Sequence, residues 1–253
     1  MIVLAGYGFV GKAFYEVFKD TVKIGIIDPA YNNNTLDDFT DVEGVVCCVS
    51  TPQGADGSCD MTNIYKLFST IPSNIPVLIK STISLEGWKK LKETYPTHWI
   101  SFSPEFLRAA TAIEDLKNSN YFILSGDLTN FWQREIYKKR FPNAQIAYYS
   151  AEEAILIKYF RNSFLATKVS FFNEIFDLCN VLGIKFDNVR KGVAEDTRIG
   201  GSHTYVDKKD RGWAGACFPK DTAALLKMTE DYKINLNTLE AAVEYNNKIR
   251  NNP

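Results

Sequence analysis

Short apolar runs alternate with helix-like segments over roughly the first 150 residues. Runs as short and apolar as these suit strands that are covered on both faces. They lie at 2–5, 22–27, 42–49, 75–80, 99–103, 121–125 and 144–149. Helical segments are predicted between them, at 12–18, from about 85 and at about 130–140. The alternation predicts an α/β domain over residues 1–149, with a doubly wound parallel sheet of the Rossmann type.

The pattern changes at Ser150. Ser150-Ala151-Glu152-Glu153 has the form of a capping box, and helical character then continues to Leu182, before Gly183. At 1.5 Å per residue this helix is roughly 45 Å long. Its apolar residues cover much of its circumference, so we expect a homodimer through the helix that begins near Ser150. These residues are Ile155, Leu156, Phe160, Phe164, Leu165, Val169, Phe172, Ile175 and Phe176.

Further helices are predicted at about 186–194, from Asp221 and from Thr238. Because no strand pattern returns after Tyr149, residues 150–253 are predicted to form a second, helical domain.

A glycine-rich turn follows the first apolar run. In Gly6-Tyr7-Gly8-Phe9-Val10-Gly11 the glycines permit a tight turn and close approach to a pyrophosphate, with helix amides directed at the anion. The second run ends in Asp28, 22 positions after Gly6, near the roughly 20-residue offset of a ribose-binding acid. A carboxylate there favours NAD over NADP. The alternative is a structural glycine turn with an unrelated aspartate.

Polar residues follow three further apolar runs. Ligands of open parallel sheets bind outside the carboxyl ends of the strands. Ser50-Thr51-Pro52 and Thr82 are therefore candidates for the cofactor site, although Thr82 alternatively only starts a helix. Glu105 follows the fifth run and is a candidate general base or water ligand.

Composition narrows the classes of function. The chain has 253 residues, 45% of them hydrophobic, which is ample for a large core. Its net charge of -1 gives no electrostatic footprint for nucleic acid or an anionic membrane. No apolar run reaches the roughly 20 residues that span a bilayer. Together with the absence of a secretory signal, these features predict a soluble, cytoplasmic protein.

The five cysteines are odd in number and lack the spacing of a metal site, so we expect a reducing compartment and no metal. Cys47 and Cys48 lie within a predicted strand and are interpreted as core residues, with a redox pair as the alternative. Cys217 differs, because Gly215-Ala216-Cys217-Phe218-Pro219-Lys220-Asp221 combines a thiol, an amine and a carboxylate beside small residues. This segment is a candidate reactive loop.

Lys158 and Asn162 are four residues apart and therefore share one face of the long apolar helix. A lysine there is costly unless it is solvated or used. Both readings remain open from the residues alone.

Taken together, these motifs resemble the UDP-glucose/GDP-mannose dehydrogenase family. The resemblance covers nearly the whole chain and rests on motifs in a fixed order. They are 6–11, Ser50-Thr51-Pro52, Lys80-Ser81-Thr82, Pro104-Glu105-Phe106-Leu107-Arg108, Lys158 with Asn162, Asn173-Glu174, Asp196-Thr197-Arg198-Ile199-Gly200 and Cys217-Phe218-Pro219-Lys220-Asp221. The resemblance implies NAD-dependent oxidation of a nucleotide sugar, UDP-glucose foremost, from the C6 alcohol to the acid.

By position, the resemblance makes Cys217 the nucleophile that forms a thiohemiacetal and then a thioester. Lys220 and Lys158 would favour the thiolate or stabilise oxyanions. Asp221 with Thr82 would orient water, Glu105 would serve hydrolysis, and Asn162 would hold an oxygen of the reacting carbon. The implied substrate-binding set is Glu105, Phe106, Leu107, Arg108, Lys158, Asn162, Arg198 and Lys220.

The sequence departs from the family pattern in three places. Ala109 replaces a second glutamate, Ala214-Gly215 replaces a pair of glycines, and no third domain for the nucleotide follows the last helix. Two alternatives therefore stay open. The chain could be a half that needs a partner chain, or a dehydrogenase of a smaller sugar or hydroxy acid.

Overall fold

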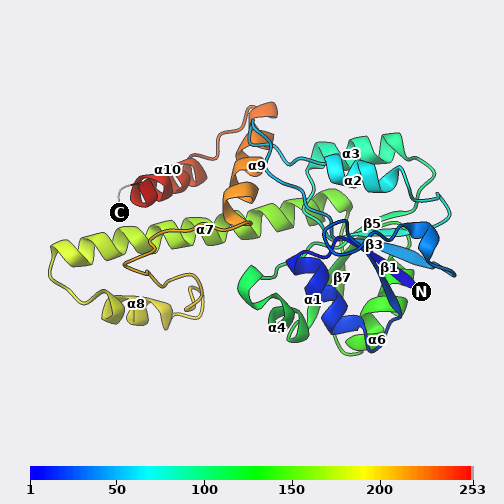
Figure 1. The fold of residues 1–253 in the computed structure, drawn as a ribbon. Coiled ribbons are helices and arrows are strands. Elements are labelled where there is room, and N and C mark those ends of the chain that lie inside the picture. Colours follow the sequence, from blue (N-terminus) through cyan, green and yellow to red (C-terminus); the bar gives the residue numbers. More distant parts are fainter. Residues whose placement is uncertain (252–253) are drawn as a thin grey trace. The chain divides into compact units, whose positions relative to one another are not determined.

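The computed structural model describes residues 1–251 and consists of two compact units (Figure 1). The first unit comprises Met1–Gly54 and Cys59–Lys158, and the second comprises Ala55–Ser58 and the chain from Tyr159 onward. The units divide within the long helix α7 (Ala151–Val181). The domain limit expected after Tyr149 stays a prediction, and the last two residues of the expected second domain, 252–253, lie outside the described residues.

One seven-stranded sheet organises the first unit, in the order β2-β1-β3-β4-β5-β6-β7. Its strands are apolar and mostly buried, as their sequences predict. β1 to β5 are parallel, whereas β6 is antiparallel to β5 and parallel to β7. The strands are β1 (Ile2–Ala5), β2 (Ile24–Ile27), β3 (Gly44–Cys47), β4 (Val77–Ile79), β5 (Ile100–Phe102), β6 (Tyr121–Gly126) and β7 (Gln145–Tyr148).

The Rossmann-type α/β fold is thus confirmed, with a mostly parallel sheet in which β6 runs antiparallel to β5. The segment between β5 and β6 is long enough to return the chain in either direction. Local sequence therefore did not determine the direction of β6.

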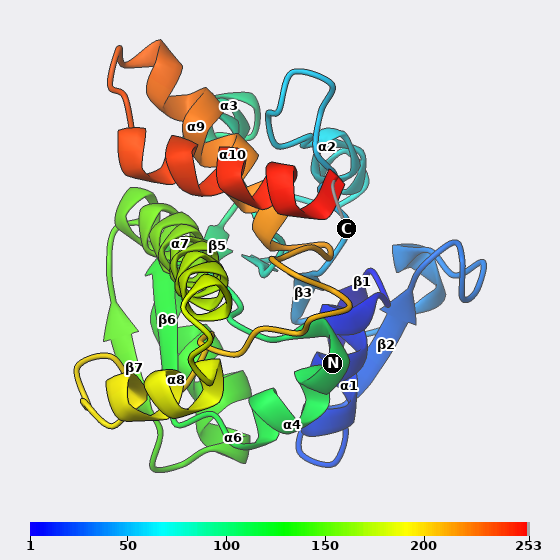
Figure 2. The same ribbon diagram turned by 90° about the vertical axis from the view of Figure 1, so that its left-hand side faces the viewer.

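Helices cover both faces of the sheet. One face carries α1 (Phe9–Phe18) and α4 (Ala112–Lys117). It also carries one continuous helical segment, which consists of α5 (Thr129–Trp132), a π-helical turn (Gln133–Tyr137) and α6 (Lys138–Arg140). On the other face lie α2 (Thr62–Phe68) and α3 (Leu85–Thr94), as the views in Figures 1 and 2 agree. Short 3-10 turns occupy Leu36–Asp38 and Ala109–Thr111.

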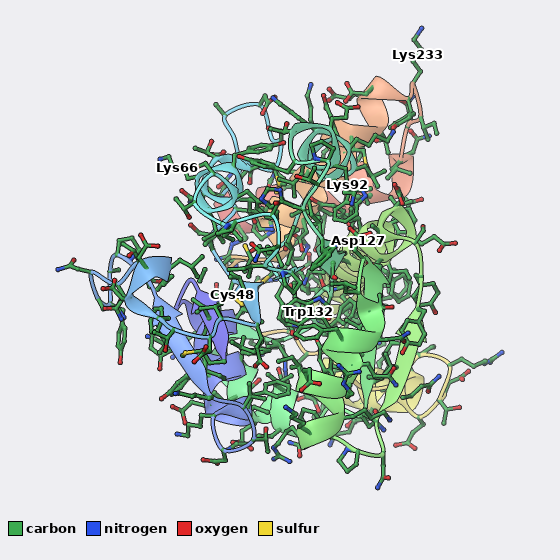
Figure 3. All side chains as sticks on the ribbon, turned by 90° about the vertical axis from the view of Figure 1, so that its right-hand side faces the viewer. Cys48, Lys66, Lys92, Asp127, Trp132 and Lys233 are labelled. Atoms are coloured by element: carbon green, nitrogen blue, oxygen red, sulfur yellow. The ribbon has the colours of Figure 1, made fainter. Side chains whose placement is uncertain are left out.

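A buried aromatic cluster anchors the first face. Phe14 and Phe18 of α1 stack with ring centroids 4.6 Å apart, and the ring of Phe122 contacts those of Tyr137 and Phe141. Trp132, labelled in Figure 3, is fully buried, and its Nε1 donates to Ser101 Oγ at 2.8 Å. The rings and the apolar strands form one core, which fixes the sheet that carries the candidate site.

The second unit contains most of α7 together with α8 (Phe186–Ala194), α9 (Phe218–Asp231) and α10 (Asn237–Asn251). The capping box at the start of α7 is confirmed, since Ser150 Oγ accepts from the Glu153 amide at 3.1 Å and Glu153 accepts from the Ser150 amide at 2.8 Å. α9 begins at Phe218, three residues earlier than expected. Cys217 is its N-cap residue, and Asp221 lies in its first turn.

Two sides of α7 in this unit differ. Phe172, Phe176 and Cys179 are buried against Phe186 of α8. An exposed side carries large apolar residues at spacings of four, seven and seven. We call this set the α7 stripe, and it comprises Phe160, Phe164, Phe171 and Leu178, with exposed fractions of 51%, 68%, 54% and 55%. Within residues 1–251 no helix is long and apolar enough to cross a membrane.

Candidate active site

The glycine turn after β1 has the shape that a dinucleotide requires. Gly6 has φ +94°, and a Cβ there would lie 2.6 Å from the backbone of Cys48, directly after the neighbouring strand β3, so only glycine fits. Gly8 is the N-cap residue of α1 and has nothing within 4 Å of its Cβ direction. Phe9 and Val10 open α1. The open backbone at a helix N-terminus fits an anionic pyrophosphate.

Asp28 lies directly after β2 and faces this turn. Its Oδ2 accepts from the Tyr7 amide at 2.5 Å, and its Oδ1 accepts from the Ala30 amide at 2.8 Å. The ring of Tyr7 contacts that of Tyr31, with centroids 4.6 Å apart. The structure thus brings together the turn and the acid that the sequence assigned to one cofactor. A carboxylate held in this way can accept from ribose hydroxyls.

The other predicted cofactor residues lie after the next two strands of the sheet. Residues 50–52 follow β3, and Thr82 follows β4. Thr51 is buried, whereas Ser50 and Pro52 are exposed, and Asn63 of α2 donates to Ser50 Oγ at 3.1 Å. Thr82 is half-buried. The N-cap residue of α3 is Ser84, whose Oγ accepts from the Gly87 amide at 2.9 Å. The alternative of Thr82 as the helix-starting hydroxyl is therefore wrong.

Glu105, after β5, belongs to a buried polar network. Its carboxylate forms an ion pair with Lys80. Lys80 Nζ also donates to Tyr137 Oη at 2.7 Å and to Ser103 Oγ at 3.2 Å, and Tyr137 and Ser103 are 2.7 Å apart. All four residues are buried. The contacts link the four side chains into one hydrogen-bonded network.

The charge on Lys80 follows from its neighbours. Burial by itself lowers the pKa of a lysine, but the Glu105 carboxylate and the Tyr137 hydroxyl outweigh burial and raise the pKa of Lys80 above its usual range. Burial also raises the pKa of Tyr137. At neutral pH the network therefore holds an ammonium and a neutral phenol.

Lys158, near the start of α7, reaches the same region. Its Nζ donates to the Glu105 carbonyl oxygen at 2.5 Å and lies 5.6 Å from the centroid of the Phe106 ring. Lys158 is 7% exposed. The interpretation of this lysine as a solvated helix residue is wrong, because burial and a specific acceptor replace solvent.

A second cluster surrounds Asp221 in the other unit. Asp221 is 1% exposed, and its Oδ2 accepts from Asn162 Nδ2 at 2.5 Å, while Lys220 Nζ lies 2.5 Å from Oδ1. The Asp221 amide donates to the Cys217 carbonyl oxygen at 2.8 Å. The structure therefore brings Asn162, Lys220 and Asp221 together one helical turn after Cys217.

Cys217 is the accessible cysteine of the five. Its residue is half-buried, whereas Cys47, Cys48, Cys59 and Cys179 are buried, and all are free thiols. Burial raises the pKa of Cys47 to about 11 and that of Cys48 well above the usual range. Neutral buried thiols agree with the core interpretation of Cys47 and Cys48 rather than a redox pair.

The remaining predicted substrate residues are on or near the surface. Leu107 packs against the sheet core and Phe106 is half-buried. Arg108 is exposed and pairs with Asp115 at 2.5 Å, and Arg198 is exposed and pairs with Asp196 at 2.5 Å. Neither arginine lacks a partner in this structure. Among residues 1–251 no group of histidine, cysteine and acidic side chains could hold a metal ion.

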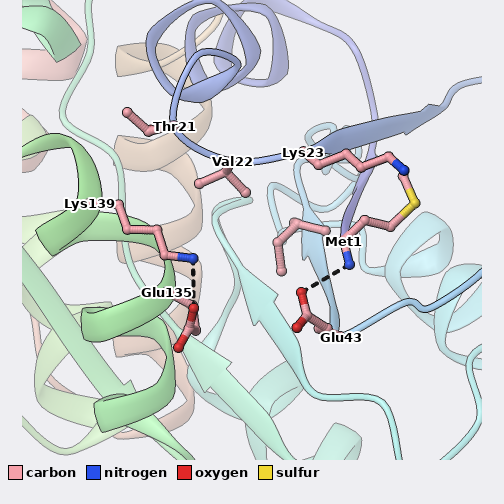
Figure 4. A pocket seen from close by; sticks show the side chains of 8 residues that line it. Met1, Thr21, Val22, Lys23, Glu43, Glu135 and Lys139 are labelled. Carbon is pink, nitrogen blue, oxygen red and sulfur yellow. Dashed lines mark hydrogen bonds and ion pairs between the residues drawn. The ribbon is translucent and has the colours of Figure 1, made fainter.

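A pocket of about 210 Å³ lies elsewhere in the first unit (Figure 4). It is lined by Met1, Lys23 and Glu43, which precede β1, β2 and β3, and by Glu135 and Lys139, which form an ion pair of 2.7 Å. The amino ends of parallel strands are the edge opposite to the candidate site. This pocket therefore belongs to a different part of the sheet.

Sequence reasoning gave no site role to Lys80, Ser103 or Tyr137. Lys80 was named only within the motif Lys80-Ser81-Thr82, although a lysine that ends an otherwise apolar strand run is itself a signal. Ser103 and Tyr137 carried none, because their hydroxyls are ordinary residues until the fold brings them to Lys80.

Comparisons with known proteins agree with this geometry. Residues 152–248 match the sequence model described as the UDP-glucose/GDP-mannose dehydrogenase family, central domain. A UDP-glucose 6-dehydrogenase of Rhizobium meliloti (strain 1021) is 33% identical over 218 residues, which are 80% of this chain and 49% of that protein. The chain thus spans about half the length of the curated relatives that it matches.

Solved structures share the fold. A UDP-glucose dehydrogenase from the archaeon Pyrobaculum islandicum matches with a TM-score of 0.85 at 22% identity, over 98% of this chain and 68% of that one. A 3-hydroxyisobutyrate dehydrogenase of Mycobacterium tuberculosis matches with a TM-score of 0.74 at 16% identity, over 99% of this chain and 94% of that one. The sequence matches, with the motifs in order on this fold, confirm the resemblance of the chain to the UDP-glucose/GDP-mannose dehydrogenase family.

Proposed function

We propose that the chain carries an NAD-dependent oxidation of the C6 alcohol of a nucleotide sugar to the acid, with UDP-glucose as the first candidate substrate. One observation carries the proposal. A buried carboxylate, Asp221, is held by Asn162 and Lys220 one turn after the accessible thiol of Cys217. The thiol of Cys217, the amide of Asn162, the ammonium of Lys220 and the carboxylate of Asp221 are the kinds of group that a reaction through a thioester needs.

NAD, when bound, accepts a hydride in each of the two oxidations. The residues that would hold it are Gly6, Gly8, Phe9, Val10 and Gly11 of the turn and Asp28 at the ribose, with 50–52 and Thr82 at the neighbouring strand ends. The open Gly8 backbone and the placement of Asp28 beside Tyr7 support this assignment.

In the first oxidation the alcohol loses a hydride from C6 and a proton from its oxygen, which leaves an aldehyde. The resemblance assigns Asp221 and Thr82 to the water that receives this proton. The two donors that hold the buried carboxylate of Asp221 support its part in this assignment. Asn162 and Lys220 can donate to the oxygen on C6 as negative charge develops there.

Cys217 then acts on the aldehyde. Its sulfur forms a bond to C6 as the C=O π bond breaks, and the thiol proton passes to the aldehyde oxygen, which gives a thiohemiacetal. Loss of a second hydride from C6 and of the hydroxyl proton yields a thioester. We assign Lys158 to the same oxygen as a second cationic donor, since it is buried and one turn before Asn162 on α7.

Hydrolysis completes the reaction. Water adds to the thioester carbon, the C–S bond breaks, and the Cys217 thiol regains its proton. We assign Glu105 to accept the proton of this water. Its ion pair with buried Lys80 supports the role, because the ammonium fixes the carboxylate in one place.

The remaining proposed contacts bind rather than react. Phe106 and Leu107 would pack against the substrate, and Arg108 and Arg198 would bind anionic oxygens. Both arginines now face carboxylates, Asp115 and Asp196, so substrate binding would exchange one acidic partner for another. This exchange lowers the net gain from each arginine.

A homodimer through α7 is part of the proposal. The α7 stripe repeats at seven-residue spacing, which is typical of a helix that packs along another helix. A second copy presents the same stripe, so a two-fold contact would cover both at once.

The test of the activity is the amount of NADH formed per molecule of sugar acid. The purified chain is supplied with NAD and, in turn, UDP-glucose, UDP-N-acetyl sugars, GDP-mannose and 3-hydroxy acids. Two NADH per acid with one of the nucleotide sugars is the expected result. NADH with hydroxy acids alone, or with none of these compounds, would reject the proposal.

A further inference from the structure

The backbone just before the cysteine loop is held by side chains from two helices of the second unit. Asn246 of α10 makes two hydrogen bonds to one residue. Its Oδ1 accepts from the Trp213 amide at 2.7 Å, and its Nδ2 donates to the Trp213 carbonyl oxygen at 3.1 Å. Asn246 is 3% exposed. Both polar atoms of a buried side chain are therefore committed to the backbone of Trp213.

α7 holds the same segment from another side. Asn173 Oδ1 accepts from the Gly212 amide at 3.3 Å and from Arg211 Nε at 3.2 Å. Trp213 Nε1 donates to Ser170 Oγ at 3.0 Å, and that hydroxyl donates to the carbonyl oxygen of a residue in α10 at 2.8 Å. Residues 211–213 are thus fixed by both helices.

The conformation of Gly212 makes the fit with Asn246 specific. Gly212 has φ +76°, and a Cβ on it would collide with Asn246 Oδ1. Any other residue would meet both an unfavourable backbone conformation and this collision. Gly212 and Asn246 therefore depend on each other.

The far end of the loop is held by Trp213 as well. Its ring meets the ring of Phe218 edge to face, with centroids 6.3 Å apart. Phe218 is the first residue of α9 and directly follows Cys217. Only residues 214–217 lie between the two rings, and 214–216 are exposed. The loop that carries the thiol is therefore a short exposed span between two fixed residues.

We propose that Asn246 is a positioning residue for Cys217. By holding Trp213 through both its amide and its carbonyl, Asn246 sets where the 214–217 span begins and thereby where the thiol lies. The inference rests on the proposed role of Cys217 as the nucleophile. It assigns a function in the reaction to a side chain of α10 that touches neither the thiol nor the Asp221 cluster through any bond described above.

Asn247 provides a matched control, since it is the next residue of α10 but is exposed. The variants to compare are Asn246→Ala, Asn246→Asp and Asn247→Ala in the full chain. The hydrogen-exchange rate of the Trp213 amide measures how well this amide is held. The rate of iodoacetamide modification measures the reactivity of the Cys217 thiol, because the four other cysteines are buried. Steady-state kinetics with UDP-glucose and NAD separate kcat from KM.

For Asn246→Ala we expect about tenfold faster exchange of the Trp213 amide, as loss of one buried hydrogen bond implies. We also expect at least threefold faster modification of Cys217, and a kcat reduced about tenfold or more with KM within twofold. Exchange in the middle of α9 should stay at the wild-type rate. Asn247→Ala should match wild type in every measurement.

Asn246→Asp keeps the acceptor for the Trp213 amide but places a carboxylate against the Trp213 carbonyl oxygen. We expect slow exchange of the amide together with a reduced kcat. If Asn246→Ala does not fold, the thiol reactivity and kcat of Asn246→Asp test instead whether Asn246 positions Cys217.

The inference is overturned if thiol reactivity and kcat in Asn246→Ala remain within twofold of Asn247→Ala. It is also overturned if exchange alone rises, because Asn246 would then order the segment without placing the thiol. If wild type oxidises no nucleotide sugar, the proposed function fails, and the exchange and thiol measurements still decide whether Asn246 positions Cys217.

Discussion

At the scale of single residues, Asp221 shows how a charge is kept inside the second unit. A carboxylate that is 1% exposed would be unfavourable without partners, but Asn162 and Lys220 both approach within 2.5 Å. The same contacts fix the orientation of its oxygens. A group of this kind suits proton transfer to an ordered water molecule.

Replacing Asp221 by Asn keeps the shape of the side chain and removes its charge. We expect kcat for UDP-glucose oxidation to fall at least a hundredfold, the usual range for loss of a general acid or base. Asp231→Asn is the control, because Asp231 is exposed at the other end of α9. Steady-state NADH formation measures both. Equal rates in the two variants would remove Asp221 from the reaction.

Lys80 and Lys92 offer a comparison between a buried and a surface ion pair in the first unit. Lys92 pairs with Asp127 at 2.7 Å, with side chains 36% and 39% exposed, and both residues are labelled in Figure 3. The side chains of Lys80 and Glu105 are 1% and 9% exposed. Removal of one partner should matter far more in the buried pair.

For Lys80→Met we expect the free energy of unfolding at pH 7 to fall by about 3–5 kcal/mol, because Glu105 is left as an unpaired buried charge. For Lys92→Met the free energy of unfolding should fall by only about 0–1 kcal/mol. Adding Glu105→Gln to Lys80→Met should restore most of the loss. Urea unfolding measures all four proteins, and similar losses for both lysines would contradict the account.

The pKa shift of Lys80 sets the pH dependence of this contribution. Because the folded pKa lies above the ordinary lysine value of 10.5, stability from Lys80 is fully present below 10.5 and is lost only as pH rises beyond it. The difference in unfolding free energy between wild type and Lys80→Met should therefore be constant from about pH 7 to about pH 9. A difference that shrinks within this window would show that Lys80 loses its proton there.

At the scale of elements, α7 has two roles. Its 31 residues begin in the first unit and continue into the second. One side packs on α8, while the α7 stripe leaves four large apolar side chains in solvent. Exposed apolar surface of this regularity is characteristic of an interface.

A charge in the α7 stripe should separate the proposed dimer. Phe164 is 68% exposed, so Phe164→Asp removes apolar contact without disturbing a core. We expect light scattering at micromolar concentration to give a dimer for wild type and a monomer for this variant. Asn180→Asp, at another exposed position of α7, should stay dimeric. A monomeric wild type would reject the dimer.

The sequence predicted the elements better than their relations. Each of the seven strand runs forms a strand, and the helix from Ser150 and that at 186–194 occur as expected. These elements have long apolar runs or clear caps. α2 was missed because its seven residues follow a polar, turn-rich loop and are too few to show a clear helical period. The early start of α9 was missed because Pro219 was taken as part of a loop, although proline is well tolerated in a first helical turn.

The candidate site divides in the same way. Residues at strand ends or helix starts, such as Gly6 and Asp28 or Lys220 and Asp221, could be named as candidates because strand ends and helix starts are visible in sequence. Tyr137 and Asn246 were not named. Each acts through a partner that is 30 or more positions away, and no local pattern marks that pairing.

At the scale of the whole molecule, the proposed reaction joins two oxidations through one covalent step. The covalent step on Cys217 links the two oxidations, because it retains the sugar between the first and second hydride transfers. The central claim is therefore about the thiol.

The most direct test compares wild type with Cys217→Ala in the ratio of NADH to sugar acid. With UDP-glucose, wild type should form two NADH for each UDP-glucuronate. Cys217→Ala should form no acid, and any NADH should stop at one per aldehyde. Acid formation by Cys217→Ala at the wild-type rate, with two NADH each, would contradict the account.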